Sequence, residues 1–337
     1  MNKLKRKRVY EERPADPDSF DVGYTERWVR EGMIGKGEFG KVFLARPAKP
    51  TSNFPSTMAV KSAHFSESTE LAKESRLLKK FRDCPYILNT YGSDVTVDAK
   101  GEKMFNVFLE YAELGTIDDC IQKLINGFRL LEQQVRKYTE SVLKGLKYIH
   151  DKGFVHCDIK PANIFLARNI PDTELCLASK FESGTKFMAK IGDFGLTKRA
   201  SKDNVMKRSG IIQGTGMYMS PEVTHDNIQE PPSDIWALGC CVLQMLTGKE
   251  EWEVSTELKD EWGHPIEIPI IPEELNDEAK DFLGKCFRMN PLERYTAEML
   301  LKHPFVCNST YVCQYGKSPL QDMRFQTQCA KNQLLFL

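Results

Sequence analysis

The chain of 337 residues is long enough for a large buried core and for about two domains or one two-lobed unit. Its 47 basic and 47 acidic side chains balance, which gives no reason to expect nucleic acid or an anionic membrane as a partner. All apolar runs fall short of the ~20 residues that a membrane span requires, so we expect no span.

The two ends of the chain differ from the rest. Residues 1–26 are charged and contain prolines, which predicts a disordered extension, and residues 307–337 are weakly patterned and predict a tail. The basic run Lys3–Arg8 is typical of a nuclear import signal or of a phosphate-binding arm, although most such runs are only solvated tails. We expect a cytoplasmic protein, and a nuclear one as well if the run is an import signal.

Residues 28–112 favour strands. The stretch WVREGMIGKGEFGKVFLARP alternates apolar and polar residues around glycines, which predicts two strands joined by a Gly-rich turn. Further strands are expected at Met58–Ala63 and within 86–95 and 103–112. One helix is expected at about Glu67–Phe81, because its leucines fall on one side.

The rest of the chain has helical periodicity. Apolar residues at three- and four-residue steps predict a long helix at about 131–151, ended by Gly153. The stretch DIWALGCCVLQMLTG is apolar almost all round, which is typical of a buried helix, and Gly248 should end it. Two later helices are expected, with Asn276 and Thr296 as N-caps. The pattern as a whole predicts an α+β fold.

The cysteines do not predict a metal site or a cross-linked fold. There are ten of them, they are scattered, and no two form a C-x-x-C pair. This arrangement argues against structural zinc and against a disulfide framework. We interpret them as free thiols of a reducing compartment.

The Gly-rich turn runs from Gly35 to Val42 and reads GKGEFGKV. Glycines let the backbone approach a bulky anion and present N–H groups to it. Dinucleotide-binding proteins also carry G-x-G-x-x-G, but there it leads into a helix. Here it leads into the strand Val42–Ala45, which disfavours a Rossmann fold.

Lys61 ends the apolar stretch Met58–Lys61, where a lysine is costly unless it has a partner. Glu74, in the predicted helix, and an anionic phosphate would both suit it. A lysine that merely extends past a sheet edge is the alternative, and the downstream loops argue against that alternative.

Two loops downstream concentrate polar groups. VHCDIKPANIF contains Asp158, Lys160 and Asn163, and KIGDFGL contains Asp193. Phosphoryl transfer needs metal ligands, a carboxylate that orients the attacking hydroxyl, and positive charge near the transferred phosphate. Asn163 and Asp193 offer oxygen ligands for Mg²⁺, Asp158 can accept the proton, and Lys160 can offset negative charge.

In this order the motifs resemble the eukaryotic protein kinases. They are the Gly-rich hairpin, A-V-K, a helical Glu, H-x-D-x-K-x-x-N, D-F-G, S-P-E and D-x-W-x-L-G. The resemblance implies a two-lobed protein kinase domain at 27–306, with an N-lobe at 27–111 and a C-lobe at 112–306.

The resemblance also implies ATP and Mg²⁺ at the site. Lys61 would contact the α- and β-phosphates and pair with Glu74, while Glu110 and Ala112 would offer backbone groups to adenine beside the gatekeeper Leu109. The other residues implied in nucleotide binding are Ile34, Gly35, Lys36, Gly37, Glu38, Phe39, Gly40, Lys41, Val42 and Ala59.

In the two loops, Asp158 is implied as the catalytic base, Lys160 and Thr215 as its neighbours, and Asn163 and Asp193 as magnesium ligands. The residues implied in the framework around them are Glu222 paired with Arg294, Asp234 as an anchor of the catalytic loop, and His156 packed with Phe194.

Several segments resemble the MAP kinase kinase kinase group. The loop DIKPAN with Lys160 resembles that of serine/threonine kinases, and GTGMYMSPEV resembles the MAP kinase kinase kinase group. VHCDIKPANI, DIWALGC and DFLGKCF are most similar to the plant branch of that group. The resemblance implies a MAP kinase kinase as the protein substrate. Gly216 departs from it, because a proline is more usual there.

Two further departures bear on regulation. Cys157 stands where an arginine commonly precedes the catalytic Asp and binds an activation-loop phosphate. The segment 166–188 makes the loop between Asn163 and Asp193 about twice its usual length, and we interpret it as a surface insertion or a docking element.

Two rival functions are a catalytically inactive kinase-like scaffold and a small-molecule phosphotransferase. The first is disfavoured because Lys61, Glu74, Asp158, Asn163 and Asp193 are all present. The second is disfavoured because the S-P-E segment and Thr215 suit a peptide acceptor. A Ser/Thr kinase outside the MAP kinase cascade stays open.

Overall fold

The computed structural model describes residues 28–37, 39–49, 54–98, 100–123, 130–168, 187–201, 210–249, 251–260 and 263–307. The predicted N-terminal extension, its basic run, nearly all of the predicted tail and most of the predicted insertion lie outside these residues. The interpretations of those segments therefore stay predictions.

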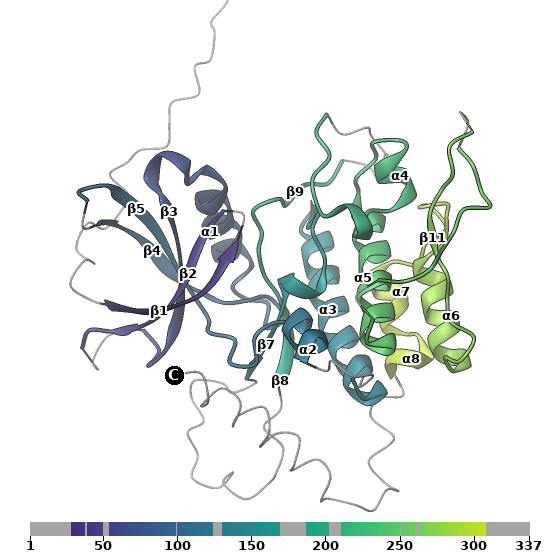
Figure 1. Cartoon of the computed structure of the whole chain (residues 1–337), viewed down its shortest axis with the longest axis horizontal. Helices are drawn as coiled ribbons and strands as arrows, with labels where there is room; N and C mark the ends of the chain where they lie inside the picture. Colours follow the sequence, from purple (N-terminus) through teal and green to yellow (C-terminus); the bar gives the residue numbers. More distant parts are fainter. Residues whose placement is uncertain are drawn as a thin grey trace, which may run out of the picture.

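A five-stranded antiparallel sheet forms the N-terminal part, in the order β1-β2-β3-β5-β4 (Figure 1). Its strands are β1 (Trp28–Gly37), β2 (Gly40–Pro47), β3 (Met58–His64), β4 (Thr90–Val97) and β5 (Lys103–Leu109). The prediction of two strands joined by a Gly-rich turn is confirmed, because β1 and β2 pair down to Gly37 opposite Gly40.

One helix, α1 (Thr69–Phe81), packs on this sheet against β4 and β5. It buries Leu71, Leu78 and Phe81, as their spacing predicts. It begins two residues later than expected, because Phe65–Glu67 form a separate 3₁₀ turn.

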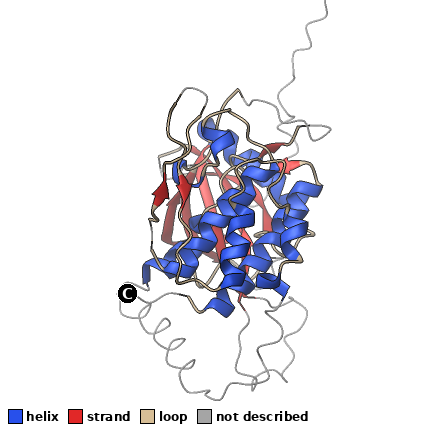
Figure 2. Ribbon diagram, turned by 90° about the vertical axis from the view of Figure 1, so that its right-hand side faces the viewer, coloured by secondary structure: helices blue, strands red, loops and turns tan. Residues whose placement is uncertain are grey.

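The C-terminal part is mainly helical and lies beside the sheet. Figure 2 shows its helices toward the viewer with the strands behind them. They are α2 (Ile117–Lys123), α3 (Glu132–Asp151), α4 (Pro221–Thr224), α5 (Pro231–Thr247), α6 (Asp277–Cys286), α7 (Ala297–Leu301) and α8 (Pro304–Cys307). None of the described helices combines the length and apolarity that crossing a bilayer demands.

The helix-end predictions hold for this part. Gly248 follows α5 with a φ of 70°, the left-handed conformation that ends many helices. Asn276 accepts a hydrogen bond from the Ala279 N–H, and Thr296 accepts one from Met299. Both are therefore N-caps.

Short strands complete the C-terminal part in three antiparallel pairs. They are β6 (Phe154–Val155) with β9 (Lys198–Arg199), β7 (Ile164–Arg168) with β8 (Phe187–Ile191), and β10 (Val254–Ser255) with β11 (Ile268–Pro269). The predicted insertion 166–188 therefore begins and ends inside paired strands, which is a correction to its limits, because residues 166–168 and 187–188 belong to β7 and β8.

One hydrophobic core runs through both parts. Phe81 of α1 packs on Phe154 and on Phe194, with ring centroids 5.4 Å apart in each pair, and His156 lies 5.0 Å from Phe194. The predicted contact between His156 and Phe194 is thus confirmed. Of the described cysteines, Cys84, Cys157, Cys240, Cys241 and Cys286 are free thiols.

A buried ion pair connects the segment before α5 to the chain after α6. Arg294 donates to both carboxylate oxygens of Glu222, at 2.5 and 2.8 Å, and its guanidinium stacks over Trp236. The predicted Glu222–Arg294 pair is therefore present. Both side chains are almost fully buried, so loss of one partner would leave an uncompensated charge.

We expect Arg294→Met to lower the free energy of unfolding by about 3–5 kcal/mol, because the Glu222 carboxylate loses its cation inside the core. Urea denaturation measures the change. The matched control is Arg288→Met at an exposed position, where a change within about 0.5 kcal/mol is expected. Equal stabilities of the two variants would contradict the prediction.

Candidate active site

Lys61 contacts carboxyl groups from two other parts of the chain. It lies in β3, and its Nζ is 2.8 Å from Glu74 Oε2 on α1 and 3.0 Å from Asp193 Oδ1 after β8. Burial disfavours the ammonium charge, but Glu74 and Asp193 outweigh burial and raise the pKa of Lys61 above its ordinary value. Lys61 therefore stays charged at neutral pH.

The loop after β6 brings the other predicted polar groups together. Lys160 Nζ lies 2.9 Å from Asp158 Oδ2 and donates to Thr215 Oγ1 at 2.8 Å, while Thr215 donates to Asp158 Oδ1 at 2.9 Å. Asn163 Nδ2 donates to Asp158 Oδ2 at 2.8 Å. Asp158 is thus held from three sides, and its side chain is 8% exposed.

The two loops meet through their backbones. The Gly192 N–H donates to the Asn163 carbonyl at 3.0 Å, which sets Asp193 beside the short 3₁₀ turn Pro161–Asn163. Asp193 has a φ of 57°, a left-handed conformation that a non-glycine residue adopts only where its surroundings hold it there.

Asp234 anchors the first loop from inside α5. Its carboxylate accepts the N–H groups of His156 and Cys157 at 2.9 and 3.0 Å and contacts His150 Nε2 at 2.8 Å. The predicted anchoring contact is thus present. Cys157 itself has a φ of 71°.

The Cys157 side chain cannot substitute for a cation. Burial raises the pKa of its thiol, and the nearby Asp234 carboxylate raises it further, so the thiol stays neutral. The position where an arginine is usual therefore carries no charge.

The Gly-rich hairpin lies over the second loop. A Cβ added at Gly195 would be 2.6 Å from the ring of Phe39, so any other residue there would force the ring to shift. Lys61 Nζ is 5.8 Å from the centre of the same ring. Of the predicted nucleotide residues, Ile34, Gly35, Lys36 and Gly37 lie in β1, Gly40, Lys41 and Val42 in β2, and Glu38 lies outside the described residues.

The predicted adenine side lies where β5 ends. Ala59 of β3 pairs with Leu109, the last residue of β5, and both are buried. The connection that follows carries Glu110 and Ala112. The Glu110 side chain receives two hydrogen bonds from Lys190 of β8, at 2.7 and 2.8 Å, and so ties this connection to the helical part.

Two contacts at the site were not predicted from the sequence. Neither a periodic pattern nor a motif in the sequence connects Lys190 with Glu110. Lys73 of α1 donates to the Gly195 carbonyl at 2.9 Å, and it stands beside Glu74, where the sequence gives no reason to single it out. Both contacts join residues far apart in the chain.

The oxygen groups present fit a hard divalent cation such as Mg²⁺. Asn163 and Asp193 bring an amide and a carboxylate oxygen, the donor types that this ion prefers. Within the described residues, no group of three or more His, Cys, Asp or Glu side chains is arranged to hold a metal ion. An ion here would therefore need additional oxygens, which a bound triphosphate and water supply.

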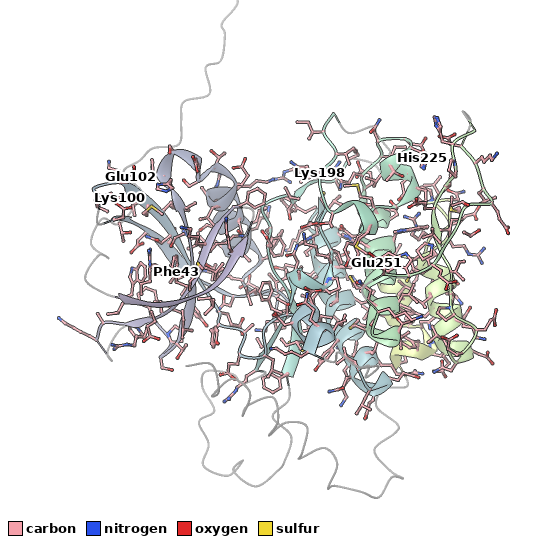
Figure 3. All side chains as sticks on the ribbon, viewed as in Figure 1. Phe43, Lys100, Glu102, Lys198, His225 and Glu251 are labelled. Atoms are coloured by element: carbon pink, nitrogen blue, oxygen red, sulfur yellow. The ribbon has the colours of Figure 1, made fainter. Side chains whose placement is uncertain are left out.

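A hollow of about 560 Å³ opens beside Thr215. Its lining includes Gly216 and Met217, which follow Thr215, together with Trp252 and Val254. Glu251 and His225, labelled in Figure 3, also line it. Its lining mixes apolar and charged side chains, and it begins at the residue after Thr215, which contacts Asp158.

Comparison with known proteins agrees with this geometry. Residues 28–306 match the family model described as "Protein kinase domain". Mitogen-activated protein kinase kinase kinase 20 of Arabidopsis thaliana is 43% identical over 285 residues, 83% of this chain and 78% of the relative. Mitogen-activated protein kinase kinase kinases 17 and 18 of the same plant are 36% and 35% identical, again over 83% of this chain, and over 69% and 78% of their own lengths.

Proposed function

Since the chain belongs to the protein kinase family, as a serine/threonine phosphotransferase similar to MAP kinase kinase kinases, we propose that it uses ATP and Mg²⁺ to phosphorylate a MAP kinase kinase. The observation that carries the proposal is the contact of Lys61 with both Glu74 and Asp193. A scaffold without catalysis has no physical need for a buried lysine that contacts two carboxyl groups.

Each part of the cluster has a role in this proposal. Bound ATP would supply the phosphoryl group, and Mg²⁺ would offset its negative charge. Lys61 binds the phosphates, and Glu74 holds Lys61 in place. Asn163 and Asp193 hold the metal through their oxygens.

The acceptor side depends on the loop around Asp158. The Asp158 carboxylate orients the acceptor hydroxyl and takes its proton, as a general base must do from hydrogen-bond distance. Lys160 offsets negative charge near the transferred phosphate, and Thr215 holds Asp158 and Lys160 in register through its hydroxyl.

The nucleotide base would lie beside the connection after β5. Backbone groups of Glu110 and Ala112 bind adenine, and the hairpin from Ile34 to Val42 covers the phosphates. The tie between Glu110 and Lys190 keeps that connection at a fixed place relative to β8 and Asp193.

The substrate class follows from the relatives and the hollow beside Thr215. The relatives are named as MAP kinase kinase kinases, and the hollow begins at the residue after Thr215, which contacts Asp158. We therefore propose that a polypeptide acceptor with an apolar residue after its serine or threonine binds there.

The test incubates the purified chain with labelled ATP, Mg²⁺ and a panel of catalytically inactive MAP kinase kinases, with a generic protein acceptor alongside. Preferential labelling of one or more of the panel is expected. Labelling of the generic acceptor alone would place the enzyme outside the cascade. ATP binding without any transfer would favour the inactive scaffold.

The neutral Cys157 leads to a prediction about activation. Because no arginine stands beside Asp158 to bind an activation-loop phosphate, we expect substantial activity from phosphatase-treated enzyme. Replacing both Ser201 and Ser209 with alanine should cost less than about tenfold in initial rate, or ~1.4 kcal/mol.

Initial rates after phosphatase treatment measure this, with phosphate stoichiometry checked by mass spectrometry. An enzyme that is silent until Ser201 or Ser209 is phosphorylated would contradict the prediction.

A further inference from the structure

Two adjacent buried residues before α5 hold two separate points of the activation segment, which runs from Asp193 to Glu222. Gln229 and Glu230 are 2% and 6% exposed. We propose that they form a clasp, with Ser201 and Gln213 as its other members, that positions Thr215 and Asp158 without phosphorylation. On this proposal, which rests on the proposed function, a negative charge at residue 201 lowers activity.

The first half of the clasp joins Ser201 to Glu230. The Ser201 hydroxyl donates to Glu230 Oε1 at 2.5 Å, and its backbone N–H donates to Oε2 at 3.0 Å. Hydrogen bonds to an ionised carboxylate are about twice as strong as neutral ones. Ser201 follows β9, which pairs with β6 just before the loop of Asp158, so the clasp extends an already paired segment.

The second half joins Gln213 to Gln229. Gln229 Nε2 donates to the Gln213 carbonyl at 2.6 Å. Gly214 comes next, with a φ of 123°, and a Cβ there would lie 2.4 Å from the Cys157 carbonyl oxygen. Gly214 therefore packs closely against the loop that carries Asp158. The next residue is Thr215, which contacts Asp158.

Both halves are fixed to the same helix turn that holds the catalytic loop. The Glu230 carbonyl accepts the N–H and the hydroxyl of Ser233, each at 2.8 Å, at the start of α5. Asp234, the next residue, holds the backbone of His156 and Cys157. The activation segment and the loop that carries Asp158 are thus both held by the start of one helix, α5.

Charge determines whether a phosphate at residue 201 would raise or lower the activity. A phosphate on the activation segment usually finds an arginine beside the catalytic Asp, but here that position is the neutral Cys157. At residue 201 an added negative charge would instead meet the Glu230 carboxylate at hydrogen-bond distance. Like charges repel at such range, so the clasp would open.

The experiment compares phosphatase-treated variants by kcat and KM for ATP and for the protein acceptor. Ser201→Asp should lower kcat/KM for the acceptor at least about tenfold, with KM for ATP within about twofold, since only acceptor-side positioning is lost. Ser201→Ala keeps the backbone N–H bond to Glu230 and should lose less. Asn227→Asp is the control for added charge close to the clasp, because Asn227 is exposed and lies two residues before Gln229, and it should change neither constant.

The rescue variant is Ser201→Asp combined with Glu230→Gln. The introduced amide can donate to the introduced carboxylate, so the pair should recover at least about half of the Ser201→Ala activity. A merely structural role for Glu230 predicts a further loss instead. If the double variant does not fold, the comparison of Ser201→Asp with Asn227→Asp decides alone.

Hydrogen exchange supplies a readout that does not need catalysis. The Ser201 N–H should be protected in the unaltered protein and exchange at least about tenfold faster in Ser201→Asp. An unaltered protein that protects this amide but transfers no phosphate would overturn the proposed function and the positioning role, while leaving the hydrogen bond intact. Higher or unchanged activity of Ser201→Asp in an active enzyme would overturn the clasp alone.

Discussion

Asp158→Asn should reduce turnover at least about a hundredfold while ATP binds almost as tightly as before, because the change removes the proton acceptor and its charge but keeps the shape. The asparagine oxygen can still accept from Asn163 or Lys160, so the loop should keep its place. Steady-state kinetics with the protein acceptor and a nucleotide-binding titration measure the two effects.

The matched control is Asp277→Asn, at the exposed start of α6, which should leave turnover unchanged. Turnover of Asp158→Asn close to that of the unaltered enzyme would remove Asp158 from the mechanism. A parallel loss of ATP affinity would instead point to a collapsed loop.

Lys61→Met and Asp193→Ala should each reduce Mg²⁺-dependent transfer to below about one hundredth of the unaltered rate. Lys61 is proposed to bind the phosphates, and Asp193 to supply a charged metal ligand that offsets the triphosphate. Single-turnover rates at saturating ATP and acceptor measure both losses. Lys79→Met, exposed on the same helix as Glu74, is the control and should be active. Normal transfer by both variants would refute the proposed site.

Lys61→Met should also lower the stability of the fold. Lys61→Met leaves the Glu74 carboxylate buried without its cation, which costs about 3–5 kcal/mol in comparable cases. Adding Glu74→Gln should restore part of that stability but none of the activity. Recovery of activity in the double variant would show that Lys61 matters for folding alone.

Short stretches of sequence correctly predicted several helix ends and one hairpin. The hairpin between β1 and β2, the N-caps Asn276 and Thr296 and the end of α5 at Gly248 all depend on a few neighbouring residues. The strand expected at 86–95 begins only at Thr90. Before it, the Leu88 N–H donates to the Ile191 carbonyl of β8, and the Ile191 N–H donates to the Tyr86 carbonyl. A partner about a hundred residues away leaves no periodic pattern in the sequence.

The residues of the candidate site, too, were only partly predicted from the sequence. The charged residues were identified from motifs, and the structure brings Lys61, Glu74 and Asp193 together, and likewise Asp158, Lys160, Asn163 and Thr215. The clasp residues Gln229 and Glu230 were not anticipated. They are polar residues before a helix, and only the tertiary fold reveals that both are buried against the activation segment.

Because of the shared aromatic contacts, we expect that the sheet part does not fold on its own. A fragment ending at residue 111 would keep α1 but lose Phe154 and Phe194, the rings on which Phe81 packs. Exposing a fully buried phenylalanine costs about 1.5–3 kcal/mol, a large share of the stability of so small a fragment. Dissection of this protein into separately expressed halves should therefore yield soluble halves only when both are present to complement one another.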